Sequence, residues 1–138
     1  MKTTRFISVL VCLFISFNVM AIKNSPNVKI LSNIEKTDAG HTKVLTSYNE
    51  TTSTPISQTS YKYDNQGNIL EKTIYKWNGS GSWIGSQKLE YKYNDNSEPT
   101  IVILTKWDNK TQTWSEKSEQ MNYTYGNEGG VYVSVADN

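Results

Sequence analysis

Residues 61–77 read YKYDNQGNILEKTIYKW, and residues 91–107 read YKYNDNSEPTIVILTKW. Each segment begins with Tyr-Lys-Tyr and ends with a tryptophan fourteen residues after the second tyrosine. A third Tyr-x-Tyr element stands at Tyr123 and Tyr125, so the pattern steps first by 30 and then by 32 residues. A period of this length indicates that the chain reuses one supersecondary unit.

Apolar and polar residues alternate within these units. Residues 89–93 read Leu-Glu-Tyr-Lys-Tyr, which is the two-residue period of a half-buried β-strand. Residues 69–77 and 100–107 carry apolar side chains at both parities, as central strands do when each face has something to cover. Fainter strands precede them at residues 43–48 and 28–34.

Segments rich in Gly, Asn and Asp separate these runs. Gly and Asn tolerate positive φ, and Asx side chains bond their own backbone, so such segments form tight reversals. The predicted turns are residues 49–55, 64–68, 78–82, 94–99, 108–113 and 126–130. We therefore predict an all-β fold, an antiparallel β-meander of about eight strands built from repeated hairpins in a single curved sheet. The alternative is a sandwich or a partly closed barrel.

The tryptophan spacing carries information about the faces of the sheet. Trp83 precedes Tyr91 by an even number of residues, whereas Trp114 precedes Tyr123 by an odd number. We expect a β-bulge between residues 115 and 122 that restores a common face for Trp114 and Tyr123, the alternative being that Trp114 lies in the loop. The uniform parity of the other aromatic residues predicts one shared face for Tyr61, Tyr63, Tyr75, Trp77, Trp83, Leu89, Tyr91 and Tyr93.

The chain begins with a segment typical of exported proteins. Lys2 and Arg5 precede an apolar run at residues 6–17, and Val19-Met20-Ala21 fits a signal-peptidase site. The run is shorter than the about 20 residues that cross a bilayer, so we expect cleavage after Ala21 and no transmembrane anchor afterwards. The predicted organisation is a signal peptide (1–21), a flexible leader (22–27) and one repeat-built β domain (28–138). We expect the mature protein in the periplasm, on the cell surface or in the medium.

The composition restricts the classes of function. The single cysteine, Cys12, lies in the predicted signal peptide, so the mature chain has no disulfide and no catalytic thiol. The 14 Lys and Arg residues nearly balance the 13 Asp and Glu residues, which argues against nucleic-acid partners. All three Phe residues also precede residue 22, so the core must be built from few aliphatic side chains, nine Tyr and four Trp.

The Tyr-Asp-x-x-Gly-Asn unit at residues 63–68, the tryptophan hairpins and the signal peptide resemble a family of small secreted bacterial proteins, domain of unknown function 3836, over nearly the whole chain. The short unit alone is similar to the tyrosine-aspartate repeats of large exported Rhs-type proteins, whose β-hairpins build extended sheets or shells. The second unit departs from this motif at residues 94, 97 and 98. The first resemblance implies no established activity, and neither supplies a catalytic residue.

The residues of the mature chain offer little for catalysis. A nucleophile needs a base and an orienting group, but the one histidine, His41, lies in a polar stretch that we interpret as a surface loop. It cannot supply a His-based zinc cluster, and the Asp- and Asn-rich turns lack the spacing of a calcium loop. The carboxylates available for glycoside hydrolysis lie mostly at turns or opposite lysines: Asp64, Glu71, Glu90, Asp95 and Glu116. We predict that the protein is not an enzyme and uses no metal or cofactor.

The aromatic residues are the remaining candidates for function. Cross-strand tryptophan pairs stabilise hairpins, which is one interpretation of them. In the other, half-exposed rings form a flat surface for sugars or a partner chain. The candidate ligand-binding residues are Trp77, Trp83, Trp107, Trp114, Tyr75, Tyr91 and Tyr93. The sequence thus predicts an exported, non-catalytic module that binds a glycan or an envelope protein. The alternative is a structural protein that forms a homo-oligomer through a sheet face or an edge strand.

Overall fold

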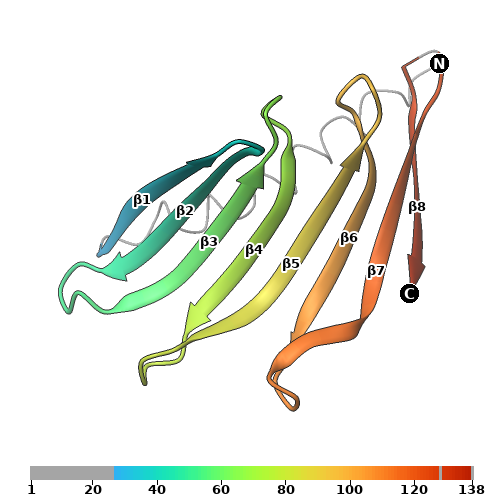
Figure 1. The fold of residues 1–138 in the computed structure, drawn as a ribbon. Coiled ribbons are helices and arrows are strands. Elements are labelled where there is room, and N and C mark those ends of the chain that lie inside the picture. Colours follow the sequence, from blue (N-terminus) through green and yellow to red (C-terminus); the bar gives the residue numbers. More distant parts are fainter. Residues whose placement is uncertain (1–26, 128, 138) are drawn as a thin grey trace.

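The computed structural model describes residues 27–127 and 129–137, and these form eight β-strands (Figure 1). The strands are β1 (Val28–Thr37), β2 (Gly40–Asn49), β3 (Pro55–Tyr63), β4 (Ile69–Trp77), β5 (Trp83–Tyr93), β6 (Pro99–Asp108), β7 (Thr113–Tyr125) and β8 (Val131–Asp137). In these ranges no helix is long and apolar enough to cross a membrane. The predicted signal peptide lies outside the described residues, as does the predicted leader except Asn27.

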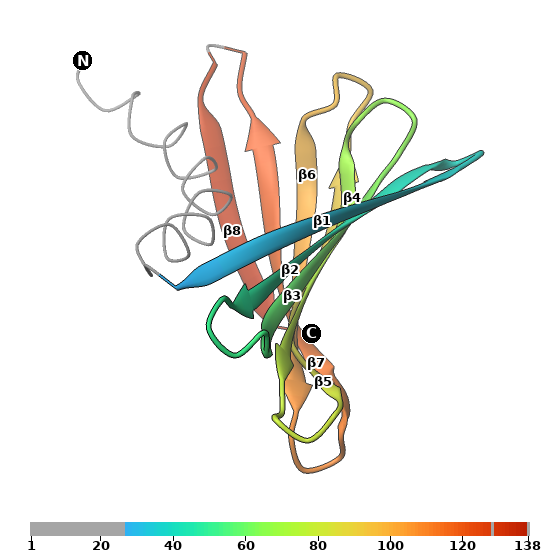
Figure 2. The same cartoon turned by 90° about the vertical axis from the view of Figure 1, so that its left-hand side faces the viewer.

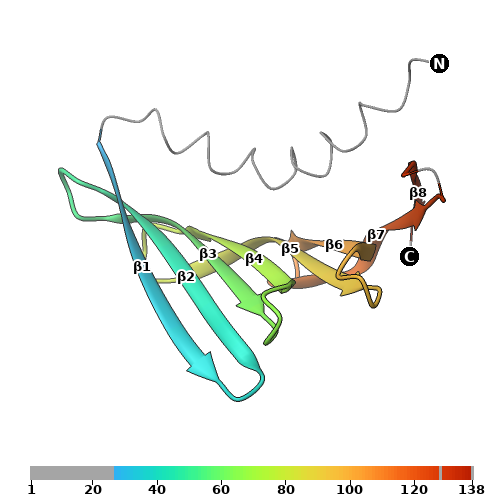
Figure 3. The same cartoon turned by 90° about the horizontal axis from the view of Figure 1, so that it is seen from above.

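The strands pair antiparallel in chain order, from β1 to β8, in one sheet. β1 and β8 stand at opposite ends of a single curved layer (Figure 3). The sheet is strongly twisted, so that β1 runs at a steep angle to β8 (Figure 2). The right-handed twist of each strand accumulates in this way across an open sheet. The predicted eight-stranded meander is confirmed, and the described strands form neither a sandwich nor a closed barrel.

The predicted turns all separate strands, with boundaries that differ by one residue at some ends. Oδ1 of Asp64 accepts hydrogen bonds from the backbone N–H groups two and four residues later, at 2.9 and 2.8 Å. Oδ1 of Asn94 accepts the equivalent pair in the second unit, both at 3.0 Å. Ser97 there adopts a φ of 58°, where Gly67 has 89°. The departures from the motif therefore leave the turn intact, because the turn needs only a side-chain oxygen and a residue that tolerates positive φ.

The strand register divides the side chains between two faces. Directly paired residues point to the same side of a sheet, and Tyr61, Lys72, Leu89 and Leu104 are successive partners across β3 to β6. We call this side the tyrosine face, and its tyrosines are Tyr61, Tyr63, Tyr91, Tyr93, Tyr123 and Tyr125. The opposite side, the tryptophan face, carries Tyr75, Trp77, Trp83, Trp107 and Trp114.

The prediction that Tyr75, Trp77 and Trp83 share a face with Tyr61 is wrong. Tyr61 pairs with Lys72, so the even-numbered residues of β4 belong to the tyrosine face. The odd-numbered aromatic residues of β4 therefore point the other way. Two odd-numbered residues on strands joined by a hairpin need not share a face. The length of the loop decides whether odd-numbered residues of one strand pair with odd-numbered or even-numbered residues of the next.

A β-bulge explains why the tryptophan at the start of β5 also leaves the tyrosine face. Gly85 pairs with Tyr75, and Gln87 pairs with Ile74, so Ser86 is one additional residue in β5. A bulge of one residue reverses the side-chain alternation on either side of it. The odd-numbered residues of β5 before Ser86 therefore point to the face opposite the odd-numbered residues after it, which places Trp83 on the tryptophan face.

The second irregularity lies where the sequence predicts it, within β7. Thr105 pairs with Ser118, and Trp107 pairs with Trp114. One residue separates the two members on β6 and three separate the two on β7, so β7 has two additional residues here. This confirms the bulge, and it places Trp114 in the strand instead of the loop. An even number of additional residues preserves the alternation, so Trp114 lies on the face opposite the tyrosines of β7, and the expectation that the bulge restores a common face is wrong.

Candidate functional site

The candidate ligand-binding residues do not form one surface. Five of the seven lie together on the tryptophan face, and we define them as the aromatic cluster: Tyr75, Trp77, Trp83, Trp107 and Trp114. Tyr91 and Tyr93 lie on the tyrosine face. The single aromatic strip predicted from the sequence is therefore two separate surfaces.

The aromatic cluster is built from two tryptophan pairs. Trp77 pairs directly with Trp83, and Trp107 with Trp114, and the ring centroids are 5.1 Å apart in both pairs. The rings meet edge to face, at 69° and 87°. Tyr75 contacts Trp114 in the same manner at 6.3 Å, which connects β4 to β7. Such pairs stabilise hairpins, yet all five rings remain partly exposed and can also contact a ligand.

Gly85 makes room for this arrangement. The residue is buried, and a Cβ added to it would stand 2.3 Å from Cε3 of Trp107. Only glycine lets the indole approach the strand this closely. The Nε1 of Trp107 is buried and has no hydrogen-bond partner among the described residues. The cluster therefore rests on the backbone of β5 instead of on a layer of side chains.

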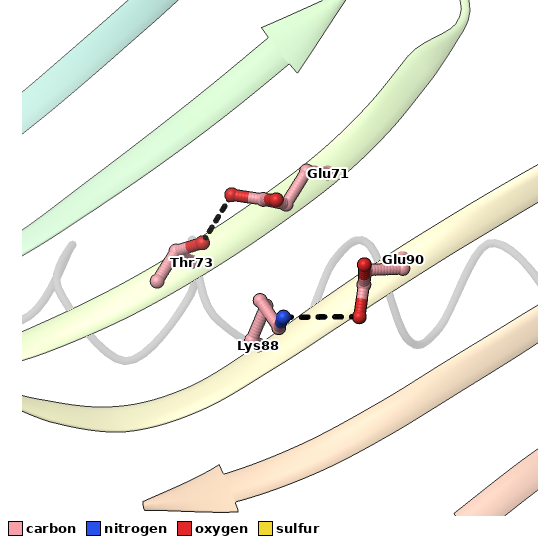
Figure 4. A network of polar contacts seen from close by, with 4 residues as sticks. All are labelled: Glu71, Thr73, Lys88 and Glu90. Atoms are coloured by element: carbon pink, nitrogen blue, oxygen red, sulfur yellow. Dashed lines mark hydrogen bonds and ion pairs between the residues drawn. The ribbon is translucent and has the colours of Figure 1, made fainter. Parts of the chain in front are cut away.

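Charged side chains lie on the same face as the aromatic cluster, and Figure 4 shows the polar contacts that they make: Glu71 with Thr73, and Lys88 with Glu90. The Nζ of Lys88 lies 5.9 Å from the ring centroid of Trp114 and 3.1 Å from a carboxylate oxygen of Glu90. Glu71, the direct partner of Glu90 on β4, accepts a hydrogen bond from the hydroxyl of Thr73 at 2.9 Å. Two carboxylates and an ammonium thus stand beside stacking surfaces, and these groups can hydrogen-bond the hydroxyls of a sugar.

The tyrosine face holds a hollow of about 280 Å³. Its lining is almost wholly apolar: Ile69, Gln87, Leu89, Tyr91, Tyr93, Pro99, Val102, Leu104, Met121 and Tyr123. Val102, at 5% exposure, is the most deeply buried apolar side chain of the described residues. No sequence pattern indicates this hollow, because β4 to β7 bring its residues together only through their register.

The tyrosines around the hollow are held neutral. The hydroxyl of Tyr93 donates a hydrogen bond to the carbonyl oxygen of Ile69 at 2.8 Å. Burial, and to a smaller extent the phenols of Tyr93, Tyr61 and Tyr123, raise the pKa of Tyr91 to about 12. Since a desolvated phenol is costly to ionise, these rings act as hydrogen-bond donors and apolar walls near neutral pH.

His41 lies in β2, so its interpretation as a surface-loop residue is wrong. The pairing of β1 with β2 extends to Thr37 and Gly40, which leaves a shorter turn than the polar stretch suggests. The imidazole stacks on the ring of Tyr63, with centroids 4.5 Å apart and planes at 9°. His41 therefore lies on the tyrosine face, stacked on its direct cross-strand partner.

The aspartates in the turns make their hydrogen bonds to other groups of the same turns. The side chain of Asn68, together with nearby backbone N–H groups, lowers the pKa of Asp64. The backbone N–H of Lys110 does the same for Asp108. Within residues 27–127 and 129–137, no three His, Cys, Asp or Glu side chains gather as metal ligands would.

Residues 1–125 match the model of a family of unknown function, DUF3836. The chain belongs to this family. Similar solved structures include two DUF3836 proteins, one from Parabacteroides distasonis ATCC 8503 (TM-score 0.45, 16% identity, covering 79% of this chain and 90% of that one) and one from Bacteroides vulgatus ATCC 8482 (0.43, 16%, 78% and 98%). A protein of unknown function from Bacteroides fragilis NCTC 9343 is also similar (0.45, 12%, 83% and 94%). A search of curated proteins found no match. The DUF3836 match ends with the last residue of β7, so β8 lies beyond it.

Proposed function

We propose that this DUF3836 protein is an exported, non-catalytic binding module that holds a glycan of the cell envelope against its aromatic cluster. The observation that carries the proposal is the gathering of five partly exposed aromatic rings on one face, around a buried glycine. Aromatic rings bind with little loss of conformational entropy, because each has only two side-chain torsions. Sugars present C–H faces to such rings and hydroxyl groups to the charged residues beside them.

The neighbours of the aromatic cluster support a polar ligand over an apolar one. Lys88 and Glu90 form an ion pair on the same face, next to the ring of Trp114. Both side chains stay partly exposed, so their remaining hydrogen-bonding capacity is available to a ligand. An apolar partner would have to desolvate these charges, which is unfavourable.

A titration of the mature protein with glycans tests the proposal. Peptidoglycan fragments and a glycan array supply the ligands, and the change in tryptophan fluorescence reports binding. Trp83→Ala should weaken binding by about tenfold, since a stacking contact of this kind contributes about 1 kcal/mol or more. Tyr132→Ala is the matched control, because Tyr132 is 68% exposed on the same face but lies outside the aromatic cluster. Equal effects of both changes, or no glycan binding at all, would remove the basis of the proposal.

Export is part of this proposal and rests on the N-terminal sequence. Signal-peptidase cleavage after Ala21 predicts that the exported form begins at Ile22. Mass spectrometry of the protein recovered from the periplasm or medium checks this, and retention of residues 1–21 would contradict it.

A second candidate function is self-assembly through an edge strand. β8 carries no charge before Asp137, and it exposes Tyr132, Val133 and Val135 by 68%, 41% and 66%. Its outer side has no partner among the described strands. An uncharged, exposed edge is a template for pairing with another chain. Light scattering over a concentration series should then show dimers or larger species that Val133→Lys abolishes, whereas a constant monomeric mass would exclude this function.

A further inference from the structure

Lys72 is a buried lysine on the tyrosine face, between an aromatic and an aliphatic cross-strand partner. Its side chain is 4% exposed, in the middle of β4 on the tyrosine face. Tyr61 of β3 and Leu89 of β5 are its direct cross-strand partners. Burial lowers its pKa, because the ammonium loses hydration without a compensating charge.

No carboxylate neutralises this ammonium among the described residues. The two ion pairs in that part of the chain join Lys88 to Glu90 and Lys106 to Glu119. The Nζ of Lys72 instead lies 5.6 Å from the ring centroid of Tyr61, within the range of a cation–π contact. Lysines are almost never buried without a pair, so the missing anion calls for an explanation.

A second lysine, Lys43, adds positive charge to the row of paired residues that contains Lys72. Lys43 of β2 is the other direct partner of Tyr61 and is only partly buried. Two lysines therefore flank one tyrosine in a single row across β2, β3 and β4. An anionic group that meets this row gains charge-assisted hydrogen bonds in a desolvated environment, where they are stronger than in water.

The apolar hollow lies next to Lys72 along the row of paired residues, although Lys72 is not one of its lining residues. Leu89, its partner on β5, lines the hollow together with Val102, Leu104 and Met121. A volume of about 280 Å³ lies near the lower end of small-molecule sites, which is about 300 Å³. The hollow is thus suited to a short apolar chain and not to a large ring system.

We propose that the tyrosine face binds a free medium-chain fatty acid, with its acyl chain in the hollow and its carboxylate at the ammonium of Lys72. The acyl chain would fill the apolar hollow, and the carboxylate would supply the anionic partner that the ammonium of Lys72 lacks among the described residues. This site is on the opposite side of the sheet from the aromatic cluster and does not depend on it.

Isothermal titration of the wild-type protein with dodecanoate and with dodecanol, at neutral pH, tests the proposal without any variant. The two probes share a chain and differ in charge, and we expect dodecanoate to bind about tenfold more tightly. Equal affinities would overturn the role of Lys72. Binding to phosphatidylglycerol vesicles without binding of free dodecanoate would overturn the choice of ligand.

Two lysine variants then locate the carboxylate. Lys72→Met keeps the length and apolar stem of the side chain, so it should bind dodecanol as the wild type does and lose the preference for dodecanoate. Lys76→Met is the matched control, because Lys76 lies on the same strand and face but is exposed. The proposal fails if Lys76→Met loses the preference to the same extent or Lys72→Met retains it.

A nuclear magnetic resonance measurement locates the acyl chain independently. Met121 lines the hollow and is one of three methionines in the chain, so Met121→Leu assigns its methyl signal. That signal should shift on addition of dodecanoate to the wild-type protein. A bound fatty acid that leaves the Met121 methyl unmoved would place the site elsewhere.

Discussion

Replacing Gly85 by alanine should destabilise the protein through a single clash. The added Cβ would stand 2.3, 2.7 and 3.0 Å from Cε3, Cδ2 and Cζ3 of Trp107. Carbon atoms pack best at about 3.5 to 4.0 Å, so the indole must retreat by roughly 1 Å or the strands must separate. Either adjustment disturbs the contact of Trp107 with Trp114, because the rings are only 5.1 Å apart.

The expected cost follows from similar overpacking. Inserting one methyl group into a packed site costs about 1 to 3 kcal/mol. With a urea slope of about 2 kcal/mol per molar for a small domain, the unfolding midpoint of Gly85→Ala should fall by about 0.5 to 1.5 M. Tryptophan fluorescence and circular dichroism should report the same transition, and the near-ultraviolet dichroism of the folded state should change as the ring moves.

Gly130→Ala is the matched control for this experiment. Its φ is not positive, and its nearest contact to an added Cβ is 3.7 Å, an ordinary van der Waals distance. Replacing glycine at such a position stabilises a protein by about 0.4 to 1 kcal/mol through the unfolded chain, so the midpoint should stay or rise slightly. If Gly85→Ala behaved like Gly130→Ala, the close approach of Trp107 to β5 would be refuted.

Two further predictions concern pH. The pKa of Asp64 is lowered in the folded protein, so the ionised carboxylate contributes stability above its unfolded pKa of about 3.9, and this is lost as the pH falls through the folded value. Asp64→Asn keeps a side-chain oxygen as acceptor, and Asn94 closes the equivalent turn with such an oxygen. The urea midpoint of this variant should therefore fall less steeply in acid than that of the wild type. Parallel curves of midpoint against pH would contradict this. The pKa of Tyr91 is raised to about 12, so stability should decline between about pH 10 and pH 12 as unfolded tyrosine ionises first, and less so in Tyr91→Phe. Spectrophotometric titration should show the most alkaline tyrosine disappearing in that variant, and an unchanged titration curve would count against the burial of Tyr91.

Local chemistry determined much of this fold from the sequence. Strands and turns depend on near neighbours: the two-residue alternation around Tyr91, and side-chain oxygens such as those of Asp64 and Asn94 that close their own turns. The 30-residue period indicated that neighbouring hairpins repeat one design, which predicts a meander without knowledge of any long-range contact. The irregularity in β7 lies in the range that the spacing of Trp114 and Tyr123 predicts, but it adds two residues and leaves Trp114 on the other face, so the spacing predicted its place and not its effect.

Only the tertiary structure decided which side chains share a face. Pairing of Tyr61 with Lys72 and the additional Ser86 in β5 depend on loop length and bulge position, and a shift of one residue moves a side chain to the other side of the sheet. The separation of tyrosines from tryptophans, the close approach of Trp107 to Gly85 and the burial of Lys72 all follow from that register. A sequence specifies the alternation along each strand, but the face that a residue occupies is a property of paired strands.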